Sequence, residues 1–176
     1  MSASLSIDTF EPLAWVNDYT RASPPVNAAE FEPILQFSLL WNLFERDACR
    51  KNANPKAIKR AVSEAFAEGK LSLSSFQEHL IYFRDRSQRD GMTIPRYLEA
   101  LKISDASDRQ LVQGVLSSSL DDPSSSIYAL LLIANRIRNN LFHGEKKVVL
   151  LRSQIDLFRA INSLIATYLS VTKSMV

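Results

Sequence analysis

Apolar residues recur every three or four positions through most of the chain, which is the period of an α-helix that buries one face. Long stretches of alternating Val, Thr and Ile are absent, and the chain has only 4 glycines, so strands are disfavoured. We therefore expect an all-α fold. The spacing predicts helices over about residues 28–51, 55–68, 72–83, 95–101, 107–116, 122–143 and 149–171.

Two of these helices carry the same start signal. Asn54-Pro55 and Asp122-Pro123 each place a capping side chain before a proline, and proline is favoured at the first position of a helix. Gly69 and Gly144 follow the ends of the same two helices, where glycine is a common stop. These signals predict both the start and the end of the two helices.

The first 25 residues break the helical pattern with serines, threonines and the pair Pro24-Pro25. We interpret residues 1–25 as an irregular N-terminal arm lying partly against the body, and residues 26–176 as one helical domain. A chain of 176 residues fits a single core. We expect a single-domain helical bundle in which the last two long helices form an antiparallel pair.

Two segments are apolar on nearly every side. The helix from residue 28 is one, which suggests a central position. Ile127–Ala134 is the other, and we expect it to be buried between this chain's core and a second subunit. The sequence therefore predicts a homodimer through the helix over residues 122–143.

Charge and cysteine content narrow the class of protein. The net charge is only +2, but cations gather in residues 46–60 and 136–152, either as solvated helix faces or as guides for a phosphate backbone. The single cysteine, Cys49, allows no intramolecular disulfide and is expected to be buried and inert. The first 15 residues resemble no secretory signal, and Ile127–Ala134 is too short to span a membrane, so we expect a cytoplasmic protein.

Cofactor and metal chemistry have no support in the sequence. There is no Gly-rich phosphate loop and no Cys/His cluster, so we expect neither a nucleotide cofactor nor a metal. His79 is interpreted as a surface or core histidine without a catalytic role.

The segment from Arg136 to Gly144 carries the candidate chemistry. On a helical wheel, Arg136, Asn139, Asn140 and His143 form a polar face, with His143 nearly opposite the apolar stripe. A histidine at a helix C-terminus exchanges protons near neutral pH, and an arginine stabilises an oxyanion. Together they suffice for attack of an RNA 2′-hydroxyl on the adjacent phosphate without a metal. The alternative is a capping histidine beside solvated polar residues.

Arg138, four residues beginning with Asn139, and then His143 resemble the signature of HEPN domains. The run from Arg136 to Gly144, followed by Lys146, resembles HEPN proteins of toxin–antitoxin and antiphage systems. The first long helix, with Trp41, Phe44 and Glu45, also resembles the aromatic-plus-Glu first helix of several HEPN groups. The position of the motif at the end of one long helix, before another, agrees with this resemblance.

The resemblance implies an endoribonuclease toxin or defence effector whose active site is composed from two copies. Its partners would be RNA, a second copy of the chain, and a cognate antitoxin or regulatory protein. Arg136 also satisfies the spacing, but we favour Arg138 because Asn139 then directly follows the arginine. The implied roles are catalytic for Arg138, His143 and Asn139, supporting for Glu45, Arg136 and Asn140, and RNA-binding for Lys146 and Lys147.

Glu45 follows Trp41 by four residues, so the two lie on the same helix face and Glu45 is expected near the core. Arg138 near the apolar stripe would be costly to bury without a partner, which Glu45 would supply. The alternative is an exposed Glu45 paired with a neighbouring cation on its own helix. At the level of function, the alternatives are an inactive HEPN-like dimerisation or partner-binding module, and a nucleic-acid binder that uses the basic clusters alone.

Overall fold

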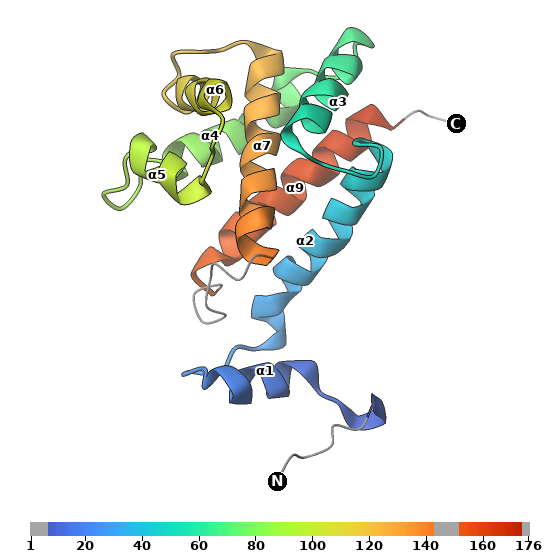
Figure 1. Cartoon of the computed structure of the whole chain (residues 1–176), viewed down its shortest axis with the longest axis vertical. Coiled ribbons are helices and arrows are strands. Elements are labelled where there is room, and N and C mark those ends of the chain that lie inside the picture. The colour runs from blue at the N-terminus through green and yellow to red at the C-terminus, as the bar shows by residue number, and fades with distance from the viewer. Residues whose placement is uncertain (1–6, 143–151, 174–176) are drawn as a thin grey trace.

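The computed structural model describes residues 7–142 and 152–173 as one all-α domain (Figure 1). Eight α-helices and three short 3-10 turns lie in these two ranges, and they contain no strand. This confirms the all-α prediction. The helices are α1 (Pro12–Thr20), α2 (Ala28–Asp47), α3 (Pro55–Ala67), α4 (Gln77–Arg86), α5 (Ile94–Leu101), α6 (Ala106–Leu116), α7 (Pro123–Phe142) and α9 (Ile155–Thr172), and the 3-10 turns are η1 (Ile7–Thr9), η2 (Leu73–Phe76) and η3 (Arg152–Gln154).

Both predicted start signals form real helix caps. The Asn54 side chain accepts a hydrogen bond from the Ala57 amide at 2.9 Å, and Pro55 is the first residue of α3. The Asp122 carboxylate accepts a hydrogen bond from the Ser125 amide at 2.8 Å, just before α7. In each case the cap satisfies a backbone N–H that has no partner within the helix.

Helix α2 ends at Asp47, four residues before the predicted end at Lys51. Arg50 and Lys51 have φ angles of 53° and 78°, so the chain leaves the helical path at this point. The turn places Cys49 in the core, where it is buried as the sequence predicts. This tertiary requirement overrides the helical periodicity, which continues through residue 51.

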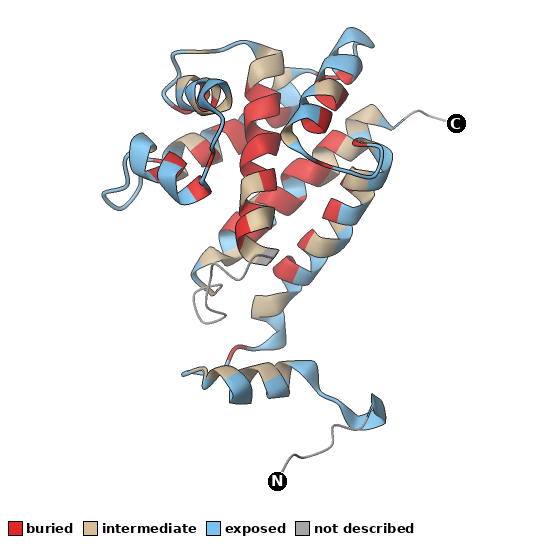
Figure 2. Cartoon of the chain, viewed as in Figure 1, coloured by how far each residue is buried: buried red, intermediate tan, exposed pale blue. Residues whose placement is uncertain are grey.

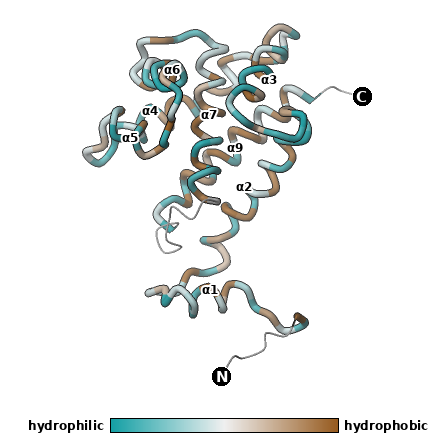
Figure 3. Tube along the Cα trace, in the orientation of Figure 1, coloured by the Kyte–Doolittle hydropathy of each residue, from teal (hydrophilic) through white to brown (hydrophobic). Residues whose placement is uncertain are grey.

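Helix α7 packs against α3, α4, α5, α6 and α9 and so lies at the centre of the body (Figure 1). Residues 127–134 are at most 3% exposed within one chain, and Figure 2 shows them as a continuous buried stretch. Figure 3 shows the same stretch as strongly hydrophobic. The expectation that a second subunit must cover Ile127–Ala134 is therefore wrong, because α3, α6 and α9 of the same chain already do so.

Helix α9 packs along α2, and the two run in the same direction. Phe37 meets Phe158 with ring centroids 5.5 Å apart, and Phe44 meets Tyr168 at 5.6 Å. Helix α7 runs the opposite way and crosses α9, with which it has only a short contact. The last two long helices, α7 and α9, are antiparallel as predicted, but they touch over only a short length. The long contact of α9 is with α2, an early helix that periodicity cannot identify as its partner.

Helix α2 is not central, contrary to the expectation from its composition. One face is buried, but the opposite face exposes Leu35 and Leu39, which are 62% and 71% exposed. The N-terminal arm also differs from the prediction, since Pro12–Thr20 forms a regular helix with Pro12 at its start. None of the described helices is long and apolar enough to cross a membrane.

Candidate functional site

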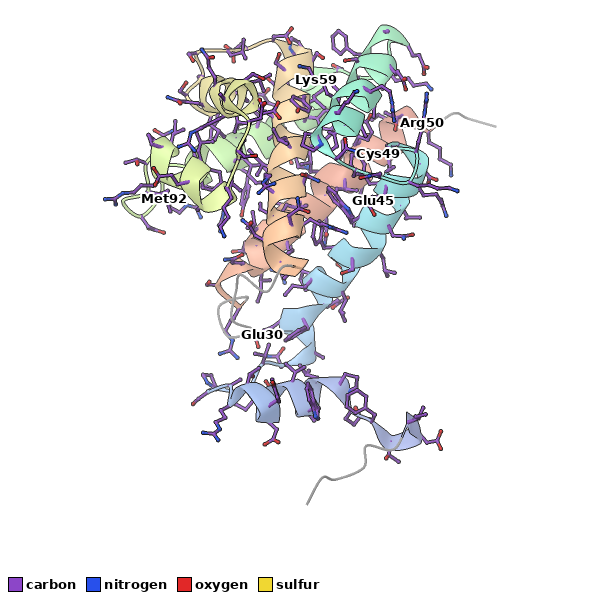
Figure 4. All side chains as sticks on the ribbon, in the orientation of Figure 1. Glu30, Glu45, Cys49, Arg50, Lys59 and Met92 are labelled. Atoms are coloured by element: carbon purple, nitrogen blue, oxygen red, sulfur yellow. The ribbon has the colours of Figure 1, made fainter. Side chains whose placement is uncertain are left out.

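Arg138 and Asn139 lie on α7 and line a small pocket of about 160 Å³. The other walls are the C-terminal half of α2, which contributes Glu45, and the loop over residues 52–55. Figure 4 labels Glu45 near the end of α2, just before the turn that carries Cys49 and Arg50. The full lining is Glu45, Asn52, Ala53, Asn54, Pro55, Asn135, Arg136, Arg138 and Asn139.

The pocket brings together three of the residues singled out in the sequence. Arg138 and Asn139 are half-buried, and the Arg138 Nη1 donates a hydrogen bond to the Asn139 Oδ1 at 3.3 Å. Glu45 lines the same pocket, and its direct pairing with Arg138 stays a prediction.

Arg136 and Asn140 have a different task on the neighbouring side of α7. The Arg136 Nε donates to the Leu101 carbonyl at 2.9 Å, and the Asn140 Nδ2 donates to the Ala100 carbonyl at 3.0 Å. Both carbonyls lie at the C-terminus of α5, where the helix itself provides no further donors. The polar face predicted for this end of α7 is therefore not fully open to solvent. Two of its residues contact α5, and one of them, Asn140, is buried.

The hydrogen bonds of Arg136 and Arg138 differ, which matters for the choice between the two arginines. The Arg136 guanidinium is held against α5, although its side chain also lines the pocket. Arg138 also lines the pocket and donates to its neighbour Asn139. The preference for Arg138 over Arg136 therefore stays a prediction from the motif.

Asn135 belongs to the pocket and was missed by the sequence analysis. It is only 4% exposed, and its Nδ2 donates to the Ala53 carbonyl at 2.6 Å, which ties α7 to the loop before α3. The Asn135 Oδ1 is buried and accepts no hydrogen bond from the described residues. The available signal was an asparagine directly after an all-apolar segment and four residues before Asn139.

His143, Lys146 and Lys147 lie outside the described residues. The described part of α7 ends at Phe142, which directly precedes His143 in the sequence. Their predicted roles in proton transfer and RNA binding therefore stay predictions.

The other histidine and the single cysteine are buried in the core and are not part of the pocket lining. The His79 Nε2 lies 3.0 Å from the Ser163 Oγ, which links α4 to α9. Burial lowers the pKa of His79 below its usual value, because the imidazolium loses hydration. Burial raises the pKa of Cys49 to about 12, so its thiol is protonated at neutral pH.

The chemistry available at the pocket is that of two arginines, four asparagine amides and one carboxylate. A guanidinium and amide groups bind a phosphate or polarise an oxyanion, whereas Glu45 is the proton acceptor among the lining residues. Within residues 7–142 and 152–173, no group of three His, Cys, Asp or Glu side chains is placed to hold a metal ion. A larger hollow of about 640 Å³ along α6 has no charged residue in its lining.

Comparison of the chain with protein-family models, with curated proteins and with solved structures finds no match. The resemblance to HEPN domains therefore rests on the residues of the motif and on the helical context around it.

Proposed function

We propose that this chain is a metal-independent endoribonuclease of the HEPN type, with an active site composed from two copies of the chain. A role as a toxin or as an antiphage defence effector follows from the same resemblance. The substrate is RNA, and a cognate antitoxin or regulatory protein would restrain the activity.

One observation carries the proposal. The arginine and asparagine of the sequence Arg138-Asn139-x-x-x-His143 line a pocket at the end of a central helix, and Glu45 of a distant helix lines the same pocket. Polar side chains at the end of an otherwise buried helix are costly unless they serve packing or function. Arg136 and Asn140 donate to the C-terminal carbonyls of α5, and Arg136, Arg138 and Asn139 line the pocket.

The reaction needs one base, one acid and one cation. The 2′-oxygen of a ribose attacks the adjacent phosphorus, forming a new O–P bond while the P–O5′ bond breaks. The base takes the 2′-hydroxyl proton, and the 5′-oxygen of the leaving strand gains a proton, so the products are a cyclic phosphate and a 5′-hydroxyl. We assign proton transfer to His143 and stabilisation of the phosphate charge to Arg138, with Asn139 orienting one of these groups.

The test is to incubate the purified chain with total RNA in the presence of EDTA. We expect cleavage that leaves cyclic phosphate ends, because the chemistry uses the RNA's own hydroxyl and no metal. The His143→Ala variant purified in parallel should lose most of this activity, which also excludes a contaminating nuclease. Loss of cleavage in EDTA, or 3′-hydroxyl products, would contradict the proposal.

A second candidate function is an inactive HEPN-like module that binds a partner protein. The observation in its favour is the apolar surface that α1 and α2 leave uncovered. This function requires neither Arg138 nor His143. It would be the better account if parent and His143→Ala proteins behave alike toward RNA.

A further inference from the structure

We propose that the pocket between α7, α2 and the loop over residues 52–55 binds the Watson–Crick edge of a guanine base of the RNA substrate. The inference rests on the proposed function, because it names the base that the RNA presents beside the bond that is cleaved. It assigns the recognition of this base to Asn135 and Glu45, which both line the pocket.

Asn135 provides a hydrogen-bond acceptor that the fold leaves unused. The side chain is only 4% exposed, and its Nδ2 donates to the Ala53 carbonyl at 2.6 Å. This bond fixes the orientation of the amide, because exchanging its two ends would set the Oδ1 against another oxygen. The Oδ1 is buried and accepts no hydrogen bond from any of the described residues. A buried acceptor without a donor is unfavourable, so a ligand N–H that reaches this oxygen is stabilised there.

Glu45 provides a second acceptor in the same pocket. It is half-buried, and it is the one carboxylate among the described residues that line the pocket. The Lys51 amide donates to the Glu45 carbonyl at 2.7 Å, which holds the turn after α2 against this residue. A carboxylate has about four acceptor sites. Glu45 can therefore accept from a ligand even when it also pairs with Arg138, as the sequence predicts.

The other side-chain oxygens of the lining are engaged elsewhere or lie in water. The Asn54 Oδ1 caps α3 by accepting from the Ala57 amide at 2.9 Å. The Asn139 Oδ1 accepts from the Arg138 Nη1 at 3.3 Å, and Asn52 is exposed. The pocket thus offers two acceptors to a ligand, and its arginines and amide nitrogens are donors around them.

This arrangement discriminates between the parts of an RNA. A phosphate has only acceptors, so it would pair with the arginines and leave Glu45 and Asn135 without a donor. Guanine has two neighbouring donor groups on its Watson–Crick edge, N1–H and the N2 amine, with the acceptor O6 beside them. Adenine, cytosine and uracil each have one donor group on this edge. Guanine therefore matches two acceptors with donors next to them.

The size and the walls of the pocket fit one base. Its volume of about 160 Å³ lies below the roughly 300–1,000 Å³ of typical small-molecule pockets, so it admits the edge of one flat group and not a whole nucleotide. Ala53 and Pro55 add apolar surface for the face of the ring. We assign the N1–H to Glu45 and the N2 amine to Asn135. The sugar and the phosphate stay outside, and Arg138 of the same lining is available to the phosphate.

The test measures the affinity of the full chain for nucleosides, which have a base and a sugar but no phosphate. Isothermal titration calorimetry should give guanosine a dissociation constant about 5–150-fold lower than those of adenosine, cytidine and uridine, the usual range for one well-placed pair of hydrogen bonds to a base. Inosine lacks the N2 amine and should bind more weakly than guanosine. No binding, equal affinities, or a preference for another base would overturn the inference.

Two variants test the assigned residues. Glu45→Gln keeps the size of the side chain and removes its charge, and it should weaken guanosine binding about 10-fold. Glu32→Gln is the matched control on the same helix, because Glu32 is exposed, bonds Gln36 and lies outside the pocket lining. It should bind guanosine like the parent. A folded Glu45→Gln variant with the affinity of the parent would contradict the role of the carboxylate.

Asn135→Ala should reduce the preference for guanosine over inosine, because Asn135 is assigned to the amine that inosine lacks. Comparing two ligands on one variant cancels any loss of folded protein. If this variant does not fold, the comparison of guanosine with inosine on the parent still decides whether the N2 amine is recognised. An unchanged ratio of the two affinities would contradict the role of Asn135.

The RNA cleavage assay separates this inference from the proposed function. A chain that prefers guanosine but never cleaves RNA keeps the base pocket and removes the ribonuclease. A chain that cleaves RNA in EDTA beside all four bases alike keeps the ribonuclease and removes the base pocket. Cleavage sites that share a guanine next to the broken bond would support both.

Discussion

Residues 127–134 of α7 and the helix α1 are both rich in apolar side chains, yet the chain treats them in opposite ways. It covers the α7 segment on all sides, whereas Pro12–Thr20 contains no buried residue. The difference lies in the neighbours: α7 packs against several helices of the body, whereas α1 lies beyond the N-terminal end of α2, where Asn17 bonds Val26. Apolar composition alone therefore does not tell which of the two segments is buried within one chain.

The largest expected effect on stability comes from the covered side of this comparison. Leu132 is 1% exposed, so Leu132→Ala should lower the free energy of unfolding by about 2–5 kcal/mol through lost burial and a cavity. Ile81→Ala removes the same number of carbons from an exposed position and should change it by no more than about 0.5 kcal/mol. Urea unfolding of both variants measures the difference. Equal effects would mean that Leu132 is not enclosed by one chain.

A smaller effect separates two adjacent asparagines near the end of α7. Asn140→Ala leaves the Ala100 carbonyl of α5 without its side-chain donor and should cost about 1–3 kcal/mol of unfolding free energy. Asn139→Ala, on the pocket side, is the matched control and should cost less, since Asn139 is only half-buried. If Asn139→Ala were the more damaging variant in urea unfolding, the assignment of the two sides of α7 would be reversed.

The smallest expected effect is a pH dependence from the core. Burial lowers the pKa of His79 in the folded protein, so the unfolded chain binds its proton more readily. The stabilisation from neutral His79 is complete above about pH 6.5 and is lost as the pH falls below that value. The melting temperature should fall between pH 7.5 and pH 5.5, and His79→Gln should reduce this fall.

The control for this pH dependence is His143→Ala, which removes the other histidine of the chain. It should retain the fall in melting temperature with decreasing pH. A parent protein whose melting temperature is constant over this range would contradict the assignment to His79.

The parts of the fold that depend on contacts between residues close together in the sequence were predictable. The caps at Asn54 and Asp122 use contacts three residues apart, and both are present in the structure. The partner of α9 was not predictable, because the contact of Phe37 with Phe158 joins residues far apart in the sequence. The turn at Arg50 and Lys51 was missed for the same reason, since it satisfies packing rather than helical periodicity.

The candidate site was predictable only in part. Helical spacing identified Arg138 and Asn139 as neighbours in a polar segment, and Glu45 as a residue near the core; the structure adds that all three line one pocket. The spacing did not identify Arg136 and Asn140 as the residues that bind the end of α5. That contact depends on where α5 lies, which a helical wheel of α7 alone does not show.

The most direct test of the account compares RNA cleavage in EDTA by Arg138→Ala, His143→Ala, the double variant and Arg136→Ala. Proton transfer contributes about 10²–10⁴-fold to rate, so His143→Ala should lose activity on this scale. Arg138→Ala should lose a comparable amount, and the double variant should be scarcely slower than either single variant, because the residues act on one transition state. Arg136→Ala should cleave RNA at close to the parent rate as long as the variant stays folded. Arg138→Lys should recover little of the activity, since an ammonium does not reproduce the planar guanidinium. If all these variants cleave RNA like the parent, the proposed site does not exist.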